Sequence, residues 1–157
     1  MPCKKKSASP RPSAASWTAK FREEQMDGDL RKLFRKNIPE AMWVSIESGS
    51  TGAGIPDSWY CFRGGSSGWL EYKFTKTLTY RISPFQIAFH QALARFGSRS
   101  FVAVRRKNKA VDELYMIPGA LASGRVDGKP DGVYGPTKWN WKEVKFLCLS
   151  GCRTHKI

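Results

Sequence analysis

Two short apolar runs flank a stretch rich in glycine and serine. The first run covers residues 58–62 (SWYCF), the second covers residues 69–74 (WLEYKF), and residues 64–68 lie between them. Short apolar runs of this length are typical of strands, and the glycines and serines between the runs mark a turn. The pattern therefore predicts a β-hairpin with a longer loop.

Two segments carry apolar residues at helical spacing. Residues 17–37 predict a first helix, with a stripe of Met26, Leu30, Leu33 and Phe34, which ends before Pro39. The second helix begins at Ser83-Pro84-Phe85-Gln86, where Ser caps, Pro takes the first helical position and Gln completes a capping box. Its expected buried stripe consists of Phe85, Ala88, Phe89, Ala92, Leu93 and Phe96, and Gly97 ends it.

The remaining patterns complete an α/β arrangement. Residues 42–46, 101–104 and 114–117 predict further strands, residues 118–136 predict loops, and residues 139–149 predict a last strand or a short helix. Helices and strands in this order predict one domain with a mixed central β-sheet flanked by helices. We expect a disordered basic tail at residues 1–16 and a domain at 17–157, with a core at about 20–117 and a C-terminal extension at 118–157.

The charge of the chain narrows the choice of partner. Its 157 residues include 27 Lys and Arg against 13 Asp and Glu, which gives a net charge of +14. Such an excess indicates a polyanionic partner. No apolar run approaches the ~20 residues of a membrane-spanning helix, and no secretory signal is evident. We therefore expect a cytoplasmic protein that binds nucleic acid, with reduced cysteines; Cys148 and Cys152 lack the second pair that a zinc site needs.

Three residues of the predicted hairpin could support a reaction. Asp57 lies at the start of the first strand, and Glu71 and Lys73 lie in the second strand. Side chains at i and i+2 share one face of a strand, so Glu71 and Lys73 emerge together. Two carboxylates can bind a hard divalent cation, and an ammonium can orient water or stabilise negative charge, as phosphodiester hydrolysis requires. The alternative is that these residues form an ordinary polar strand face.

The same residues carry a family resemblance. Pro56-Asp57 followed by Glu71-Tyr72-Lys73 resembles the PD-(D/E)xK nuclease superfamily. The wider string, with Gly54-Ile55 before and Ser83-Pro84-Phe85-Gln86 after, is similar to the VRR-NUC and Holliday-junction-resolvase branches over about residues 27–104. The resemblance implies a restriction-endonuclease-like αβββαβ core and a metal-dependent endodeoxyribonuclease.

The resemblance also implies roles for individual residues. Mg²⁺ or Mn²⁺ would bind Asp57 and Glu71, Lys73 would activate water, and Gln86 would help to position the lysine or the water. A third acid would come from the first helix, where Asp27 and, one turn earlier, Glu24 are candidates; Glu47 is an alternative. The residues expected to contact nucleic acid are Ser48, Ser50, Lys76, Arg81, Arg105, Arg106 and Lys107.

The expected substrate is DNA with structure, such as a junction, flap or nick, in phage or mobile-element recombination, replication or repair. A phage enzyme would act in the host-cell cytoplasm, and a junction resolvase would need a homodimer. No membrane and no small-molecule cofactor are expected. Three alternatives stay open: a non-catalytic nucleic-acid-binding protein on the same fold, a sequence-specific restriction-type enzyme, and a basic structural protein.

Gln86 could also serve only as a helix cap, and His90 is expected to be packed or exposed rather than a catalytic base.

Overall fold

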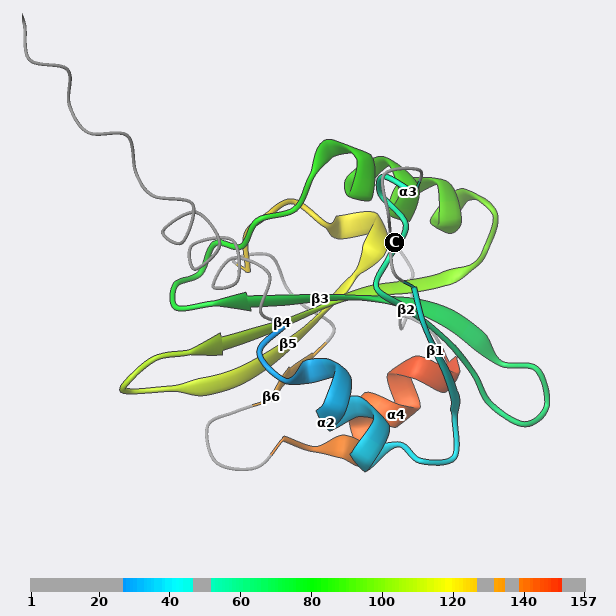
Figure 1. Cartoon of the computed structure of the whole chain (residues 1–157), viewed down its shortest axis with the longest axis horizontal. Coiled ribbons are helices and arrows are strands. Elements are labelled where there is room, and N and C mark those ends of the chain that lie inside the picture. The colour runs from blue at the N-terminus through cyan, green and yellow to red at the C-terminus, as the bar shows by residue number, and fades with distance from the viewer. Residues whose placement is uncertain (1–26, 47–51, 127–131, 135–138, 151–157) are drawn as a thin grey trace, which may run out of the picture.

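The protein is built on one mixed β-sheet, seen edge-on in the computed structural model (Figure 1). The structure describes residues 27–46, 52–126, 132–134 and 139–150. Six strands lie in the order of the sequence, and only β3 and β4 run parallel. The predicted fold class is confirmed. The strands are β1 (Met42–Ser45), β2 (Ser58–Cys61), β3 (Ser67–Thr75), β4 (Arg99–Lys107), β5 (Asp112–Pro118) and β6 (Gly132–Tyr134).

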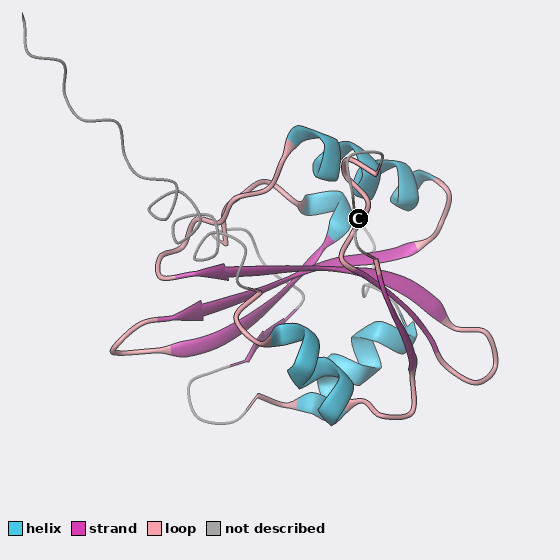
Figure 2. Ribbon diagram, in the orientation of Figure 1, coloured by secondary structure: helices cyan, strands magenta, loops and turns pink. Residues whose placement is uncertain are grey.

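Helices cover both faces of this sheet (Figure 2). Helices α2 (Leu30–Asn37) and α4 (Trp141–Ser150) lie on one face, which we call the α2 face. Helix α3 (Pro84–Arg95) and the short 3-10 helix η1 (Gly119–Leu121) lie on the other, the α3 face. The order α2, β1, β2, β3, α3, β4 is the expected αβββαβ series. Helix α3 is the crossover that parallel strands require.

The alternation predicted for the hairpin holds in β3. Leu70 and Tyr72 join the core cluster on the α2 face, together with Leu30 and Phe34 of α2. Glu71 and Lys73 point to the α3 face, where Gln86 of α3 contacts both. The last segment is a helix rather than a strand. It adds Val144, Leu147 and Cys148 to the same core, and Trp141 packs edge-on against Phe34 with ring centroids 5.2 Å apart.

The prediction of one continuous helix over residues 17–37 is wrong at residues 28 and 29. Helix α2 begins only at Leu30, because Gly28 and Asp29 both have positive φ, 59° and 62°. A side chain at Gly28 would lie 2.6 Å from the Phe74 ring, so glycine is required there. Asp27 therefore precedes the helix, and its Oδ1 accepts the backbone N–H of Asp29 at 3.0 Å. Residues 1–26 lie outside the described residues.

The prediction of a buried phenylalanine stripe on α3 is also wrong. Phe85 and Phe96 are 68% and 90% exposed, and His90 is the buried residue of the helix. The capping box explains the rotation. Gln86 faces the sheet in order to reach Glu71, and His90, one turn later, follows it onto that face. Phe85 and Phe96 are thereby turned toward solvent, whereas Phe89 remains half-buried and packs edge-on against Trp69.

The region expected to be loops contains more regular structure than its glycines and prolines indicated. Helix η1 follows β5, and β6 pairs with β5 through Leu114↔Tyr134 and Met116↔Gly132. Strand β4 also runs on to Lys107, so Arg105 and Arg106 lie in the strand instead of the predicted basic turn. Within the described ranges, no helix combines the length and the apolar character needed to cross a membrane.

Candidate active site

The predicted acids meet where β2 separates from β3. The pairing of these strands begins at Ser58↔Leu70, so Asp57 lies just beyond it, beside the free edge of β3. The backbone N–H of Tyr72 donates to Asp57 Oδ2 at 2.8 Å, and the N–H of Ile46 donates to the Asp57 carbonyl, also at 2.8 Å. The backbone on both sides thus fixes Asp57. Its side chain remains half-buried, 32% exposed.

Glu71 is the buried centre of this site, with an exposure of 1%. Its Oε1 accepts two hydrogen bonds, from Lys73 Nζ at 2.7 Å and from Gln86 Nε2 at 2.6 Å. Its Oε2 is buried and has no hydrogen-bond partner among the described residues. One oxygen therefore holds the carboxylate in place, and the other is left with its lone pairs unused.

Gln86 caps α3 and also contacts the two charged residues of β3. Its Oε1 accepts the backbone N–H of Ser83 at 3.0 Å, and its backbone N–H donates to Ser83 Oγ at 3.1 Å, which completes the capping box. Its Nε2 reaches Glu71, and Lys73 Nζ donates to its Oε1 at 3.3 Å. The start of α3 is thus bonded directly to the two charged residues of β3.

Burial changes the proton affinity of both acids. The pKa of Glu71 rises from 4.5 to about 7, first because the side chain is desolvated and second because the charge of Asp57 is near, whereas Lys73 acts in the opposite direction. The pKa of Asp57 is also raised by burial, against the hydrogen bond from Tyr72 and the charges of Lys73 and Arg31. Burial is therefore the main reason that both acids hold their protons more tightly, and repulsion from the Asp57 charge adds to it at Glu71.

The donor set fits a hard divalent cation in part. Asp57 and Glu71 offer carboxylate oxygens, and the unpaired, buried Glu71 Oε2 is the type of atom that a cation would satisfy. No group of three or more His, Cys, Asp or Glu side chains that could hold a metal occurs within the described ranges. Remaining positions would be filled by water, as is usual for Mg²⁺. The predicted third ligands Glu24 and Glu47 lie outside the described residues.

Asp27 lies near this site and is linked to it by an arginine, and its charge is among the influences that raise the pKa of Asp57. Arg31 Nε lies 3.7 Å from Asp27 Oδ2, and Arg31 Nη2 lies 3.9 Å from Asp57 Oδ1. The guanidinium also lies over the ring of Tyr72, 5.8 Å from its centroid. Sequence reasoning treated Arg31 as one of several basic residues on a helix surface. Only the tertiary placement of α2 against β3 singles it out.

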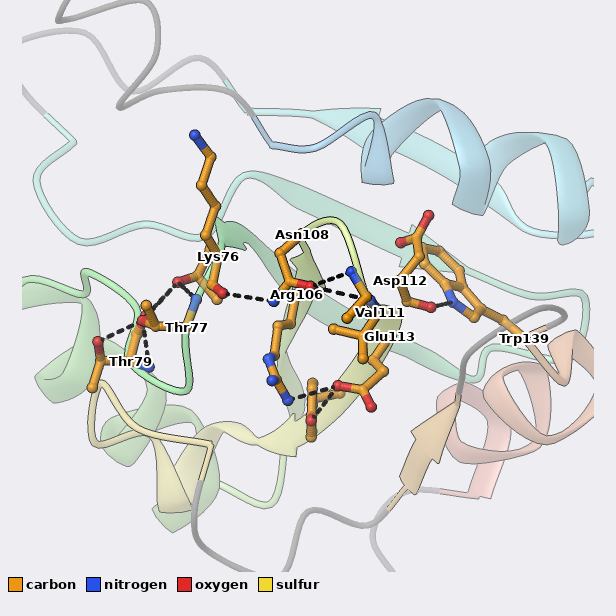
Figure 3. Close-up of polar contacts among 12 residues, drawn as sticks. Lys76, Thr77, Thr79, Arg106, Asn108, Val111, Asp112, Glu113 and Trp139 are labelled. Atoms are coloured by element: carbon orange, nitrogen blue, oxygen red, sulfur yellow. Dashed lines mark hydrogen bonds and ion pairs between the residues drawn. The ribbon is translucent and has the colours of Figure 1, made fainter.

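The residues predicted to contact nucleic acid fall into three groups. Lys76 and Arg81 are exposed in the segment that leads from β3 to α3, and Lys76 extends away from the sheet in Figure 3. Asn108 of the β4–β5 turn donates to the Lys76 carbonyl at 3.2 Å and braces this segment. Ser48 and Ser50 lie outside the described residues. The third group is Arg105, Arg106 and Lys107.

The members of this third group are paired with acids inside the chain. Arg105 donates to both oxygens of Asp112 at 2.8 and 2.6 Å and to the Gly28 carbonyl at 2.6 Å, and it lies over the Trp139 ring. Arg106 donates to Glu113 at 3.1 Å, and Lys107 lies 3.6 Å from Asp112. Arg105, with 11% side-chain exposure, thus joins β4 to β5 and to the segment before α2.

His90 is packed, as expected. It is fully buried against η1, where an added side-chain carbon at Gly119 would lie 2.6 Å from His90 Nδ1. Neither ring nitrogen has a hydrogen-bond partner among the described residues. Burial, with a contribution from Lys73, lowers the pKa of His90 to about 4, so the ring is neutral at pH 7.

The double role of Gln86 gives a first prediction with a matched control. Gln86→Ala removes the capping-box bond from the Ser83 N–H to Gln86 Oε1 together with the donor to Glu71. Ser83→Ala removes only the other capping-box bond, from the Gln86 N–H to Ser83 Oγ. We expect each change to cost about 1 kcal/mol of unfolding free energy, measured by urea denaturation. Only Gln86→Ala should also lower the turnover of the reaction proposed below, by about tenfold or more. Equal turnover in the two variants would limit Gln86 to capping.

Comparisons with known proteins return one weak structural likeness. No family model matches the sequence, and a search of curated proteins finds no significant match. Among solved structures, a match is Hjc, a Holliday junction resolvase from the archaeal hyperthermophile Archaeoglobus fulgidus. The two chains are 18% identical, the alignment covers 60% of this chain and 79% of that chain, and the TM-score is 0.43. The functional proposal below therefore rests on the side chains of this chain.

Proposed function

We propose that this protein is a metal-dependent endonuclease that hydrolyses phosphodiester bonds in DNA, with selectivity for structured DNA. The observation that carries the proposal is the arrangement around Glu71: one oxygen held by Lys73 and Gln86, the other buried without a partner, and Asp57 beside it. A site of this composition has no evident structural purpose, because the burial and mutual repulsion of its acids oppose folding.

Each side chain has a defined part in this proposal. Asp57 and Glu71 would hold Mg²⁺ or Mn²⁺. A bound cation would lower the pKa of a coordinated water and neutralise charge on the phosphate. Lys73 would donate a hydrogen bond to the attacking water or to the negative charge that develops on the phosphate. Gln86 fixes the side chains of Glu71 and Lys73 relative to each other through one hydrogen bond to each. The +14 charge and the exposed Lys76 and Arg81 would attract the DNA backbone.

The proposal is tested with purified protein on labelled single-stranded, duplex, flap and four-way-junction DNA, and on matching RNA, with Mg²⁺, Mn²⁺ or EDTA. Asp57→Asn is the variant of choice, since the amide can still accept the Tyr72 N–H and should fold. Cleavage that needs metal and disappears in Asp57→Asn is the expected result, and the preferred substrate would identify the selectivity. If the protein binds every substrate but cleaves none with any metal, the enzyme hypothesis is wrong, and a non-catalytic nucleic-acid-binding protein takes its place.

A further inference from the structure

Arg31 lies between two carboxylates without forming a hydrogen bond to either. Its distances of 3.7 Å to Asp27 and 3.9 Å to Asp57 exceed the ~3.2 Å limit of a good N–H···O bond. Within the part of the chain that the structure describes, the Arg31 guanidinium makes ion pairs and a ring contact only. About a third of its side chain, 31%, is exposed. Its donors are therefore available to a ligand.

Three other arginines near the sheet each donate at least one hydrogen bond within the chain. Arg105 makes three hydrogen bonds of 2.6–2.8 Å, Arg35 donates to Ser45 Oγ at 2.7 Å, and Arg106 donates to Glu113 at 3.1 Å. Arg31 lies over the Tyr72 ring but, unlike Arg105 over Trp139, makes no hydrogen bond to a carboxylate among the described residues, and the backbone N–H of Tyr72 also fixes Asp57. One residue of β3 thus positions both the arginine and the acid, while the guanidinium edge stays open.

We propose that Arg31 is a substrate-binding residue that grips a phosphate of the nucleic acid, and that it leaves Asp57 for this phosphate when a divalent cation binds. The inference rests on the proposed function. A guanidinium and a metal cation compete for the Asp57 carboxylate and repel each other. A phosphate placed between them relieves this repulsion, and an arginine can bind it through two parallel hydrogen bonds.

If Arg31 acts in this way, the cation and the nucleic acid bind cooperatively, and Arg31 couples the two binding events. Without nucleic acid, Arg31 opposes the cation, so Arg31→Ala should bind Mn²⁺ about tenfold more tightly, a usual size for coupling between two sites. With nucleic acid, Arg31 is part of the phosphate contact, so the same variant should bind DNA about tenfold more weakly. Arg31→Lys keeps the charge but not the paired donors. It should leave Mn²⁺ affinity near that of the wild type and recover only part of the DNA affinity.

The experiment measures Mn²⁺ binding to the full chain by EPR, and DNA binding by fluorescence anisotropy both in EDTA and with Ca²⁺ as the divalent cation. The loss of DNA affinity in Arg31→Ala should be larger with the cation than in EDTA, and an equal loss would contradict the coupling. Arg35→Ala is the matched control, because Arg35 lies one turn further along α2, and neither affinity should change. If Asp57→Asn abolishes Mn²⁺ binding but Arg31→Ala behaves like Arg35→Ala, the role of Arg31 is disproved and the metal site stands. If the wild type binds no Mn²⁺ through Asp57, the proposed function fails and the inference fails with it.

Discussion

Replacing Lys73 by Ala is expected to lower the rate of DNA cleavage about a thousandfold while leaving DNA affinity nearly unchanged. Loss of one donor aimed at developing charge typically costs about 10²–10³ in turnover. A second effect adds to the first. Lys73 lowers the pKa of Glu71, which burial has already raised to about 7. Without Lys73, more of Glu71 is protonated at pH 7, and a protonated carboxyl is a poor ligand for a cation.

The pH profile separates these two effects. Cleavage by Lys73→Ala should still rise with pH where the wild type has reached its plateau, because Glu71 ionises later, yet it should not reach the wild-type rate. Lys142→Ala is the matched control, since Lys142 is exposed on α4, which covers the other face of the sheet. Its turnover should be that of the wild type. A Lys73→Ala turnover within threefold of the wild type would remove Lys73 from the mechanism.

The parts of the site that the sequence predicted are the parts that local rules determine. Alternation along β3 placed Glu71 and Lys73 on one face, and Ser83 with Gln86 formed the expected capping box. Both depend on the backbone geometry of a few neighbouring residues. The family resemblance implied that Gln86 helps to position the lysine or the water. Gln86 does contact Lys73, at 3.3 Å, whereas its bond of 2.6 Å to Glu71 was not predicted.

The parts that the sequence did not predict depend on tertiary contacts. Arg31 reaches Asp57 only because α2 packs on Tyr72. Arg105 is held in place because Asp112, which is paired with Lys107, lies diagonally from it on β5. The rotation of α3 depends in the same way on a polar contact, which overrides the stronger apolar stripe of Phe85 and Phe96. Periodicity identifies the faces of a helix, but it does not identify which face the sheet will cover.

Replacing Glu71 by Gln is expected to abolish cleavage and, at the same time, to stabilise the fold at pH 8. A carboxyl whose pKa rises on folding binds more protons in the folded state, so its contribution favours folding at low pH and declines as the pH rises from 4.5 to about 7. Above pH 7 the buried carboxylate is charged, and its burial is the largest influence on its pKa. An uncharged amide avoids that cost, so we expect a gain of about 2 kcal/mol in EDTA, somewhat below the full value of the shift.

Urea denaturation of both proteins at pH 5 and pH 8 measures this effect. The quantity of interest is the difference between Glu71→Gln and the wild type at each pH, because His90, whose lowered pKa has the opposite dependence, then cancels. Glu113→Gln is the control: Glu113 lies on the same face but accepts bonds from Arg106 and Tyr115, so its amide should bring no gain at pH 8. A Glu71→Gln difference that is the same at both pH values would show that the carboxylate is not destabilising. A gain at pH 8 combined with lost cleavage would mean that the chain keeps a costly charge in its sheet for the sake of the reaction.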